Sequence, residues 1–303
     1  MVKEVLKRKS ENGRILFIIV MLAIPIISFL FFYVYVNINS IIMAFQRPRY
    51  DGSGIYDWTF DNFRMFFEEL VGSDSDILLC LLNTVIFFCQ DMFISLPLSL
   101  IICYFIFKKI SGYKFFRTVI YLPIIISSTI FATLYRYLVG TGGPLFAFWQ
   151  SIGKEPIYFF ANSDYALTGI LFFVIYSSLG ARFVLFGGAM NAIDDGVIDA
   201  GKIDGAGTFR ELFNIVIPAI WPTLGTLLLL SSVGLFTASG PILLFTKGEY
   251  RTNTLSFWIY GLTTGITGST DYEYASAIGI VFTLLGLPLV LVVKRLTGIT
   301  EDK

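Results

Sequence analysis

Long runs of apolar residues recur along the chain and are separated by shorter polar segments. Six runs have the roughly 20 residues that a helix needs to cross a bilayer, and they cover residues 15–36, 77–107, 118–138, 165–188, 219–245 and 275–293. Because backbone groups in lipid must hydrogen-bond within their own segment, each run predicts a transmembrane helix. We therefore expect an all-α, polytopic membrane protein with six transmembrane helices.

Single charged residues interrupt three of these runs, at Asp91, Arg136 and Arg182. An ionisable side chain in a membrane segment is a candidate functional group, because its exposure to lipid costs about 3 kcal/mol at mid-depth. Asp91, beside Gln90, is expected either to face a transport path or to hydrogen-bond a neighbouring helix. Arg136 and Arg182 lie near the ends of their runs, so we expect both to extend to the lipid headgroups.

Composition supports a membrane protein and excludes several functions. Hydrophobic residues make up 55% of the chain and charged residues 15%, with a mean hydropathy of +0.75, whereas soluble domains have about 25% charged residues. The formal net charge is zero, so no basic field attracts nucleic acid. The chain has no histidine, which argues against an enzyme with a Ser-His or Cys-His nucleophile. Cys80, Cys89 and Cys103 lack paired spacing and are expected to be small apolar residues.

The distribution of basic residues predicts the orientation of the helices. Lysine and arginine are retained preferentially on the cytoplasmic side. The loops and tail on the side of the N-terminus hold 14 of them, and the opposite loops hold 6. Both termini are therefore expected in the cytoplasm. The first run is too long for the core of a signal peptide, so we expect it to stay in the mature protein.

The cytoplasmic segment 189–218, between the fourth and fifth runs, has the pattern of two short helices. Apolar residues recur at helical spacing, and they are Ile193, Val197, Ala200 and Gly201 in the first helix and Phe209, Leu212, Phe213 and Val216 in the second. Asp194 and Asp195 are candidate caps of the first helix, while Thr208 and Glu211 predict a capping box at the second. The glycine-rich residues 204–207 predict the turn between them. The apolar face of this hairpin must be buried on the membrane domain or on another protein.

The residues from Asp199 to Pro222, DAGKIDGAGTFRELFNIVIPAIWP, resemble the EAA coupling motif of bacterial ABC importer permeases. Six residues stand at family positions with the family spacing, and they are Ala200, Asp204, Gly205, Ala206, Ile215 and Pro218. Three positions depart from the pattern, with Asp199 for Glu, Gly201 for the second Ala, and Leu212 where Phe is usual. The shorter side chains at positions 199 and 201 lie where the motif packs, so they bear on the strength of coupling.

Further motifs resemble the carbohydrate branch of this family, maltose-type in architecture, and extend over most of the chain. They are Trp58 to Phe63, Asn83-Thr84, Phe116-Arg117, Tyr121-Leu-Pro123, and Thr254-Leu with Tyr260. The resemblance implies a single permease domain over residues 1–303, with a five-helix core at about 77–293 and one added helix at 15–36. It also implies that 189–218 is the coupling loop, with Asp199, Ala200, Gly201, Asp204, Gly205, Ala206, Ile215 and Pro218 as the residues that contact an ATPase.

The resemblance further implies the partners of such a permease in the bacterial cell membrane. They are a second permease, two ATP-binding cassette subunits, and an extracytoplasmic sugar-binding lipoprotein or binding protein. The chain has no G-x-x-x-x-G-K-[ST] phosphate-binding loop. We therefore expect no cofactor on this chain, and ATP with Mg on the partner ATPase. The outer loop 46–76, rich in acidic and aromatic residues, is expected to be either a docking surface or a solvated loop whose aromatics lie at the interface.

A sugar path requires hydrogen-bonding side chains beside aromatic rings inside the helix bundle. The candidates are Gln90, Asp91, Tyr176, Ser177, Ser232 and Ser239. Hydroxyls in membrane helices also join helices without touching substrate, and this alternative applies to each of them. The pair Gly240-Pro241 is expected to kink or break the fifth helix.

Two other functions are compatible with the sequence. One is an ABC permease for another polyol or a glycerol-phosphate solute. The other is a secondary transporter driven by protons or sodium, which requires ionisable relays in the membrane, and among the residues of the six runs only Asp91 is a clear candidate.

Overall fold

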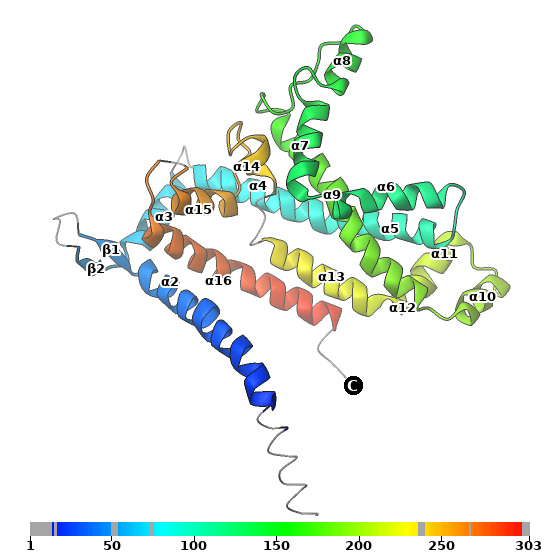
Figure 1. Cartoon of the computed structure of the whole chain (residues 1–303), viewed down its shortest axis with the longest axis horizontal. Coiled ribbons are helices and arrows are strands. Elements are labelled where there is room, and N and C mark those ends of the chain that lie inside the picture. The colour runs from blue at the N-terminus through cyan, green and yellow to red at the C-terminus, as the bar shows by residue number, and fades with distance from the viewer. Residues whose placement is uncertain are drawn as a thin grey trace, which may run out of the picture. The chain divides into compact units, whose positions relative to one another are not determined.

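The structure, a computed structural model, describes Arg14 and residues 17–49, 54–72, 76–235, 240–266 and 268–298. These residues are mostly helical, and their strands form one small sheet (Figure 1). Two compact units divide the chain. The first comprises Met1–Glu68 and Thr270–Val281, and the second comprises Glu69–Ser269 and Phe282–Lys303. The candidate sites described below lie in the second unit.

The first unit combines a long apolar helix with a small sheet. Its elements are the helical segment Phe17–Ala44, which contains the π-helix η1 (Phe29–Tyr35) and α2 (Val36–Ala44), the strands β1 (Gln46–Pro48) and β2 (Tyr56–Trp58), most of α3 (Asp61–Val71) and the start of α16 (Tyr272–Thr297). The strands pair antiparallel, with Arg47 opposite Asp57. The buried Asn62 amide ties the sheet to the helices, because it donates to the carbonyls of Ala44 and Gln46 at 2.9 Å.

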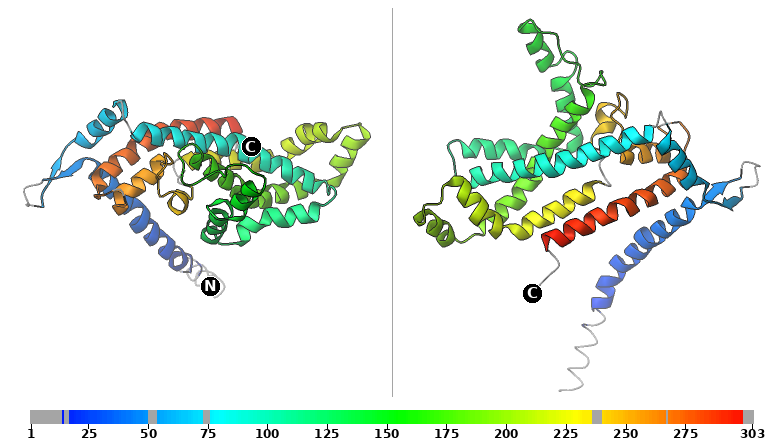
Figure 2. Two further views of the ribbon diagram at one scale, coloured as in Figure 1. Left: turned by 90° about the horizontal axis from the view of Figure 1, so that it is seen from above. Right: turned by 180° about the vertical axis from the view of Figure 1, so that it is seen from behind.

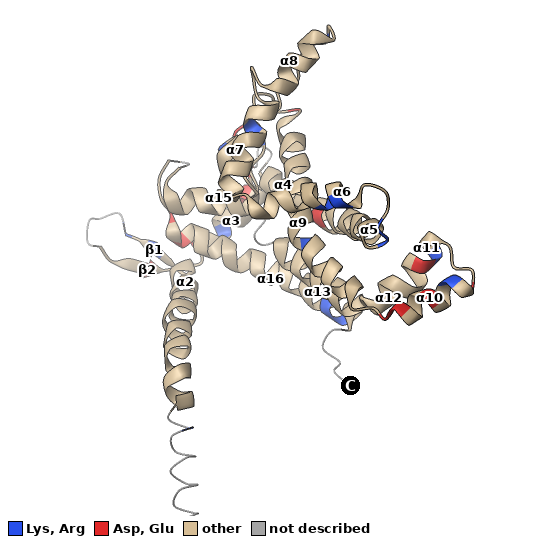
Figure 3. Ribbon diagram, turned by 45° about the vertical axis from the view of Figure 1, so that its right-hand side comes forward, with Lys and Arg blue, Asp and Glu red and all other residues tan. Residues whose placement is uncertain are grey.

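The second unit contains the remaining helices and the end of α16. In chain order they are α4 (Asp76–Gln90), η2 (Asp91–Ser95), α5 (Leu96–Phe107), α6 (Tyr113–Ile125), α7 (Ser128–Val139), α8 (Pro144–Ser151), α9 (Ala166–Asn191), α10 (Asp195–Ile203), α11 (Thr208–Glu211), η3 (Leu212–Val216), α12 (Ile217–Ala219), α13 (Trp221–Gly234), α14 (Ile242–Phe245) and α15 (Leu255–Thr264). The helices α5, α6 and α9 lie side by side (Figure 2). Charged residues gather on α10 and α11, whereas α13 carries none (Figure 3).

Four described helices are long and apolar enough to cross a membrane, and they are Phe17–Ala44, Asp76–Phe107, Ala166–Asn191 and Tyr272–Thr297. These correspond to the first, second, fourth and sixth expected spans. Two further spans are possible as bent pairs, with 113° between Tyr113–Ile125 and Ser128–Ser151 and 79° between Thr208–Ala219 and Trp221–Gly234. The prediction of a continuous third helix over 118–138 is wrong, because Ile126 and Ser127 are extended, with ψ of 140° and 134°.

The fifth predicted run is also interrupted. Helix α13 ends at Gly234, and a separate short helix, α14, begins at Ile242. Gly240 has a positive φ of 47°, and Pro241 is the N-cap of α14, so the expected break falls in this region. The prediction of a single helix over 219–245 is therefore wrong, although both ends of the run are helical.

Prolines explain two widened turns in the helices. Both π-helical turns in the second unit end two residues before a proline: η2 ends at Ser95 before Pro97, and η3 ends at Val216 before Pro218. A proline ring has no N–H and clashes with the carbonyl four residues earlier, and a wider turn relieves that clash. The chain thus passes through both prolines without ending the helix.

The core of the second unit lies where α5, α6, α9 and the end of the hairpin pack together. Among its buried members are Tyr104, Phe186, Leu212 and Ile220. Gly180 allows the close approach of α9 to α6, because a Cβ atom there would lie 3.1 Å from the Ile120 carbonyl oxygen. The expected burial of the cysteines holds for Cys80 and Cys103, whereas Cys89 is exposed.

Candidate transport and coupling sites

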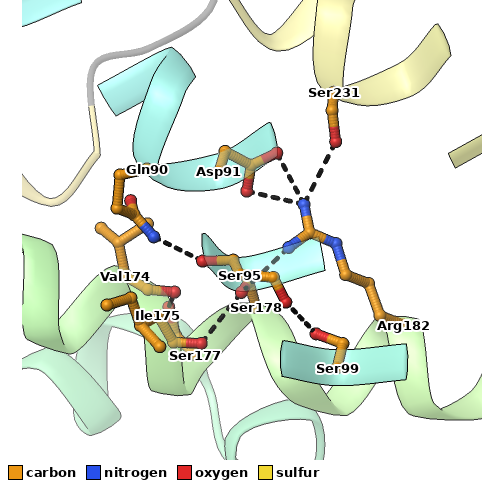
Figure 4. A network of polar contacts seen from close by, with 10 residues as sticks. All are labelled: Gln90, Asp91, Ser95, Ser99, Val174, Ile175, Ser177, Ser178, Arg182 and Ser231. Atoms are coloured by element: carbon orange, nitrogen blue, oxygen red, sulfur yellow. Dashed lines mark hydrogen bonds and ion pairs between the residues drawn. The ribbon is translucent and has the colours of Figure 1, made fainter. Parts of the chain in front are cut away.

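An ion pair joins the second and fourth apolar helices. Nη2 of Arg182, on α9, donates to both carboxylate oxygens of Asp91, on η2, at 2.6 Å (Figure 4). The Arg182 side chain is 12% exposed and the Asp91 side chain 25%. Because a charge within apolar helices is stabilised chiefly by a paired opposite charge, each residue explains the presence of the other. Asp91 is the first residue of the π-helical turn η2.

Polar side chains surround this ion pair on three helices. The Arg182 guanidinium also lies 3.4 Å from the hydroxyls of Ser178 and Ser231. On the other side, the Gln90 amide nitrogen donates to the Ser95 hydroxyl. The buried Gln90 side-chain oxygen has no hydrogen-bond partner among the described residues. The cluster therefore combines a compensated charge pair with one buried acceptor that is unsatisfied, as Figure 4 shows.

The expectation that Arg182 extends to the lipid headgroups is wrong. Its guanidinium turns toward Asp91 because the ion pair satisfies both charges within the protein. The sequence contained a signal for this pairing, since Asp91 and Arg182 are the lone charges of two otherwise uncharged runs. Arg136 is exposed, and its Nη1 donates to the Leu244 carbonyl of α14 at 3.1 Å.

The other predicted path residues occupy separate places. The Tyr176 hydroxyl donates to the Val119 carbonyl on α6 at 2.9 Å, and the hydroxyls of Ser177 and Ser232 donate to carbonyls of their own helices, Val174 and Leu228. Ser177 is drawn with the Asp91 cluster in Figure 4. Ser239 lies outside the described residues. Of the predicted set, the structure brings Gln90 and Asp91 together with Ser177 nearby.

The predicted helical hairpin is present. Its first helix is α10, and the Asp194 side chain caps it by accepting from the Gly196 amide at 2.8 Å. The turn follows at Gly205, whose φ of 75° is favourable for glycine and strained for other residues. The second helix is the continuous segment of α11, η3 and α12, and the bend into α13 comes at Ile220, two residues after Pro218.

The predicted capping box is wrong. Gly207, rather than Thr208, is the N-cap of α11, and no side-chain hydrogen bond caps this end. The Glu211 carboxylate instead accepts two bonds from the Lys108 ammonium, which follows α5, at 2.7 and 2.9 Å. The Glu211 side chain is only 2% exposed, so the cation compensates a buried charge. The sequence pattern could not reveal this pairing because the two residues are 103 positions apart.

A second bond holds the same end of the hairpin to α5. The hydroxyl of the fully buried Tyr104 donates to the Thr208 carbonyl at 2.8 Å. Together with the ion pair, it fixes α11 to the end of the Asp76–Phe107 helix. Lys108, Glu211 and Tyr104 are thus residues that sequence reasoning missed. We call these contacts the hairpin clamp.

The predicted coupling residues divide between the packed and exposed sides of the hairpin. Gly201 is buried, and Ala206 and Ile215 are half-buried; Asp199, Ala200, Asp204, Gly205 and Pro218 are exposed. Gly201 packs tightly, because a Cβ there would lie 2.3 Å from Ile215 Cδ1. Asp199 accepts a bond from Lys202 at 2.8 Å, and this contact raises the pKa of Lys202. Of the expected apolar stripes, Gly201, Leu212 and Val216 are buried and Ile193 is half-buried, whereas the other four residues are exposed.

Four large apolar residues of the hairpin are exposed, whereas Ile198 is buried and Ile193 is half-buried against the core. The exposed four are Val197, Ile203, Phe209 and Phe213, and the last two are 65% and 61% exposed. They lie in the same hairpin as the exposed coupling residues. An exposed set of large apolar side chains on a folded, clamped hairpin is typical of a protein interface.

The opposite end of the Asp76–Phe107 helix is also fixed. The Asn83 amide donates to the carbonyls of Arg251 and Asn253 at 2.8 and 2.7 Å. The Thr84 hydroxyl accepts from the Leu255 amide at the start of α15. One long helix therefore connects the loop before α15, the Asp91–Arg182 ion pair and the hairpin clamp.

These features define a polytopic helical membrane protein with a buried ion pair between its apolar helices and a folded hairpin with an exposed apolar face. Residues 80–303 match the model of one family, the inner membrane component of binding-protein-dependent transport systems. The chain belongs to this family.

Individual relatives agree with this assignment. The chain is similar to Protein LplB of Bacillus subtilis, with 27% identity over 89% of this chain and 85% of the relative. It is also similar to the polygalacturonan/rhamnogalacturonan transport system permease protein YteP of the same organism, with 26% identity over 97% and 94%. A solved bacterial ABC transporter that imports the acidic polysaccharide alginate has the same fold, with a TM-score of 0.80, 22% identity, and coverage of 97% of this chain and 99% of that chain.

Proposed function

We propose that the chain is the permease subunit of an ATP-driven ABC importer and forms the translocation path for an oligosaccharide. Membership of the family of inner membrane transport components carries this proposal. Its support is the similarity over nearly the whole chain to a permease named for polygalacturonan and rhamnogalacturonan transport, and the shared fold with the alginate importer. The chain itself performs no catalysis in this proposal.

The hairpin is the proposed coupling element. Nucleotide binding and hydrolysis on a partner move membrane helices only through a rigid element that the partner contacts. The hairpin clamp supplies that rigidity, and the exposed Phe209 and Phe213 supply an apolar contact surface. In this proposal Asp199, Ala200, Asp204, Gly205 and Pro218 contact the ATPase, while Gly201, Ala206 and Ile215 hold the hairpin together.

The partners follow from the same proposal. They are two ATP-binding cassette subunits, which bind ATP and Mg, a second permease that completes the path, and an extracytoplasmic sugar-binding protein. One solved transporter of the same fold is a complex with an alginate pentasaccharide-bound periplasmic protein. Trp58 and Phe60, at 69% and 73% exposure, are proposed contacts for such a protein.

The proposed topology has six spans with both termini in the cytoplasm of a bacterial cell membrane. Each bent helix pair then counts as one span. The excess of basic residues on the side of the termini supports this orientation. The chain is treated as one permease domain, with the first helix added to the core.

The Asp91–Arg182 cluster is the proposed part of the translocation path in this chain. Its ion pair is internally compensated, so it suits hydroxyl groups of a saccharide without a large desolvation cost. The unsatisfied Gln90 oxygen is an acceptor that a sugar hydroxyl fits. Tyr176, Ser177, Ser232 and Ser239 complete the proposed set.

The coupling role is tested by the substitution Gly205→Val. A β-branched residue at φ of 75° strains the turn by about 1 to 2 kcal/mol, too little to unfold the protein, but it alters the exposed tip of the hairpin. We expect uptake of labelled oligosaccharide to be lost while membrane insertion persists. The matched control is Gly153→Val, because Gly153 also has a positive φ, of 72°, with nothing within 4 Å of an added Cβ. Normal uptake by the Gly205 variant would reject the coupling role.

One observation favours a second substrate class. The sn-glycerol-3-phosphate transport system permease UgpA of Yersinia enterocolitica is 27% identical over 70% of this chain. Competition between labelled oligosaccharide and sn-glycerol-3-phosphate distinguishes the two substrates. Vesicles supplied with either ATP or an ion gradient test the energy source, and uptake driven by the gradient alone would establish the secondary-transporter alternative.

A further inference from the structure

A cavity of about 310 Å3 lies at the hairpin end of α5, α6 and α9. Its polar lining comes from three places: Lys109 follows α5, Tyr113, Arg117 and Tyr121 lie on α6, and Asn191 ends α9. Lys109 is adjacent to Lys108 of the hairpin clamp. The cavity thus touches both chain segments that carry the base of the hairpin, and it is separate from the Asp91–Arg182 cluster.

The charge of this cavity is uncompensated. Its lining includes Lys109 and Arg117 and no carboxylate. Neither cation forms an ion pair with another residue in the described part of the chain, although both are exposed. The Arg117 guanidinium lies over the Tyr121 ring, 5.7 Å from its centroid. Tyr121 in turn packs edge-to-face on the buried Phe183, so the exposed guanidinium contacts an aromatic ring that is anchored in the core.

Apolar residues and two glycines also line the cavity. Gly187 and Gly188 face it from α9, and Cys103 and Ile106 line it from α5. A Cβ on Gly188 would meet nothing within 4 Å, whereas one on Gly187 would lie 3.8 Å from Cys103 Sγ. The cavity therefore combines two cationic side chains with an apolar groove that α5 and α9 line.

We propose that this cavity binds the headgroup of an anionic phospholipid, with Lys109 and Arg117 pairing its phosphate and an acyl chain lying along Gly187 and Gly188. Two basic groups next to an apolar groove match a molecule that has an anionic head and a hydrocarbon tail, and basic pockets between membrane helices are typical of such headgroups. A soluble phosphate would leave the groove unused. The bound lipid stabilises the base of the hairpin, because it joins the turn after α5 to the end of α9.

This inference relies on the proposed function only for the cytoplasmic orientation of the cavity. Its test is lipid retention by the complete purified transporter in mixed phosphatidylglycerol and phosphatidylcholine, measured by native mass spectrometry without ATP or sugar. We expect phosphatidylglycerol to be retained selectively. The variant Lys109→Gln/Arg117→Gln should reduce that retention roughly tenfold or more, because each cation contributes separately. Lys114→Gln is the matched control, since Lys114 is a nearby exposed cation that does not line the cavity.

A second variant keeps both charges and fills the groove. A Cβ at Gly188 would meet nothing within 4 Å, so Gly188→Leu begins in open space. Its folding is checked by thermal unfolding, and its retention of phosphatidylglycerol is expected to fall as well. Equal retention of the two lipids, unchanged retention in both variants, or displacement of the lipid by inorganic phosphate would overturn the proposal. Sugar uptake by the unaltered transporter is measured separately, so failure of the lipid site is distinguishable from failure of the importer assignment.

Discussion

At the scale of single residues, several polar groups inside the apolar helices form bonds that link one helix to another. Pro123 lacks an N–H, so it leaves the Val119 carbonyl without its usual helical donor. The Tyr176 hydroxyl supplies that missing bond from the neighbouring helix. Asp91 and Arg182 likewise compensate each other's charge across two helices. A residue that appears as a candidate substrate ligand in the sequence can therefore also be a structural bond between helices.

The ion pair makes a prediction at this scale. Removing one partner with Asp91→Ala leaves a poorly solvated Arg182 charge, so we expect the unfolding free energy to fall by about 3 kcal/mol. The double variant Asp91→Leu/Arg182→Met removes both charges and should recover most of the stability. Thermal unfolding of the purified transporter measures both effects.

A stability control and a sugar-uptake assay distinguish a structural role of this ion pair from a role in the translocation path. Arg64→Gln breaks an exposed pair with Glu68 and should change stability by about 0.5 kcal/mol or less. If the cluster lines the path, the stable double variant still loses sugar uptake. Full uptake by a stable double variant would show that the ion pair only joins the helices.

At the scale of elements, local sequence patterns predict helices and turns. Contacts between residues far apart in the sequence cannot be predicted in this way. Apolar runs and glycine positions located the long helices, α10 and the turn at Gly205, because these depend on neighbouring residues. The pair Ile126-Ser127 was missed because the run of uncharged residues continues through it, and because Pro123 lies inside α6 rather than at its end. Glu211 was misassigned because its partner Lys108 comes from a different helix. The candidate ATPase contacts remain predictions from motif spacing.

Breaking the hairpin clamp is expected to weaken the coupling between ATP hydrolysis and transport. Glu211→Gln removes the charge that holds Lys108, so the hairpin should move less with the membrane helices. We expect sugar-stimulated ATP hydrolysis and uptake to fall by about tenfold, equivalent to about 1.4 kcal/mol of lost coupling, while basal ATP hydrolysis changes less. ATPase assays of the reconstituted transporter with and without sugar measure this ratio.

A charge exchange distinguishes coupling from general damage. The double variant Lys108→Glu/Glu211→Lys restores an ion pair at the same place and should recover part of the stimulation. Lys114→Gln, which removes a nearby cation outside the clamp, should behave like the unaltered transporter. Wild-type stimulation in Glu211→Gln would show that the clamp does not transmit the motion.

At the scale of the whole molecule, composition was enough to predict a membrane protein, but the number and direction of its spans depend on how the bent pairs are placed. Four helices are long enough alone, and the bends at Ile126-Ser127 and Ile220 decide the other two. The proposed orientation rests on the distribution of basic residues between the two sides of the membrane. The family match over residues 80–303 identifies the chain as a component of a transport system, and no single residue carries that information.

The proposed orientation predicts which side of the membrane can be labelled. In a chain with its three cysteines replaced by alanine, a single cysteine at Lys154→Cys should react with a membrane-impermeant maleimide in intact cells. A single cysteine at Phe209→Cys should react only in inverted vesicles, because Phe209 lies on the exposed face of the hairpin. Assembly with the ATPase should then block the second reaction, since the same apolar face becomes buried. Labelling of Phe209→Cys from outside intact cells would reverse the topology and remove the hairpin from any cytoplasmic ATPase.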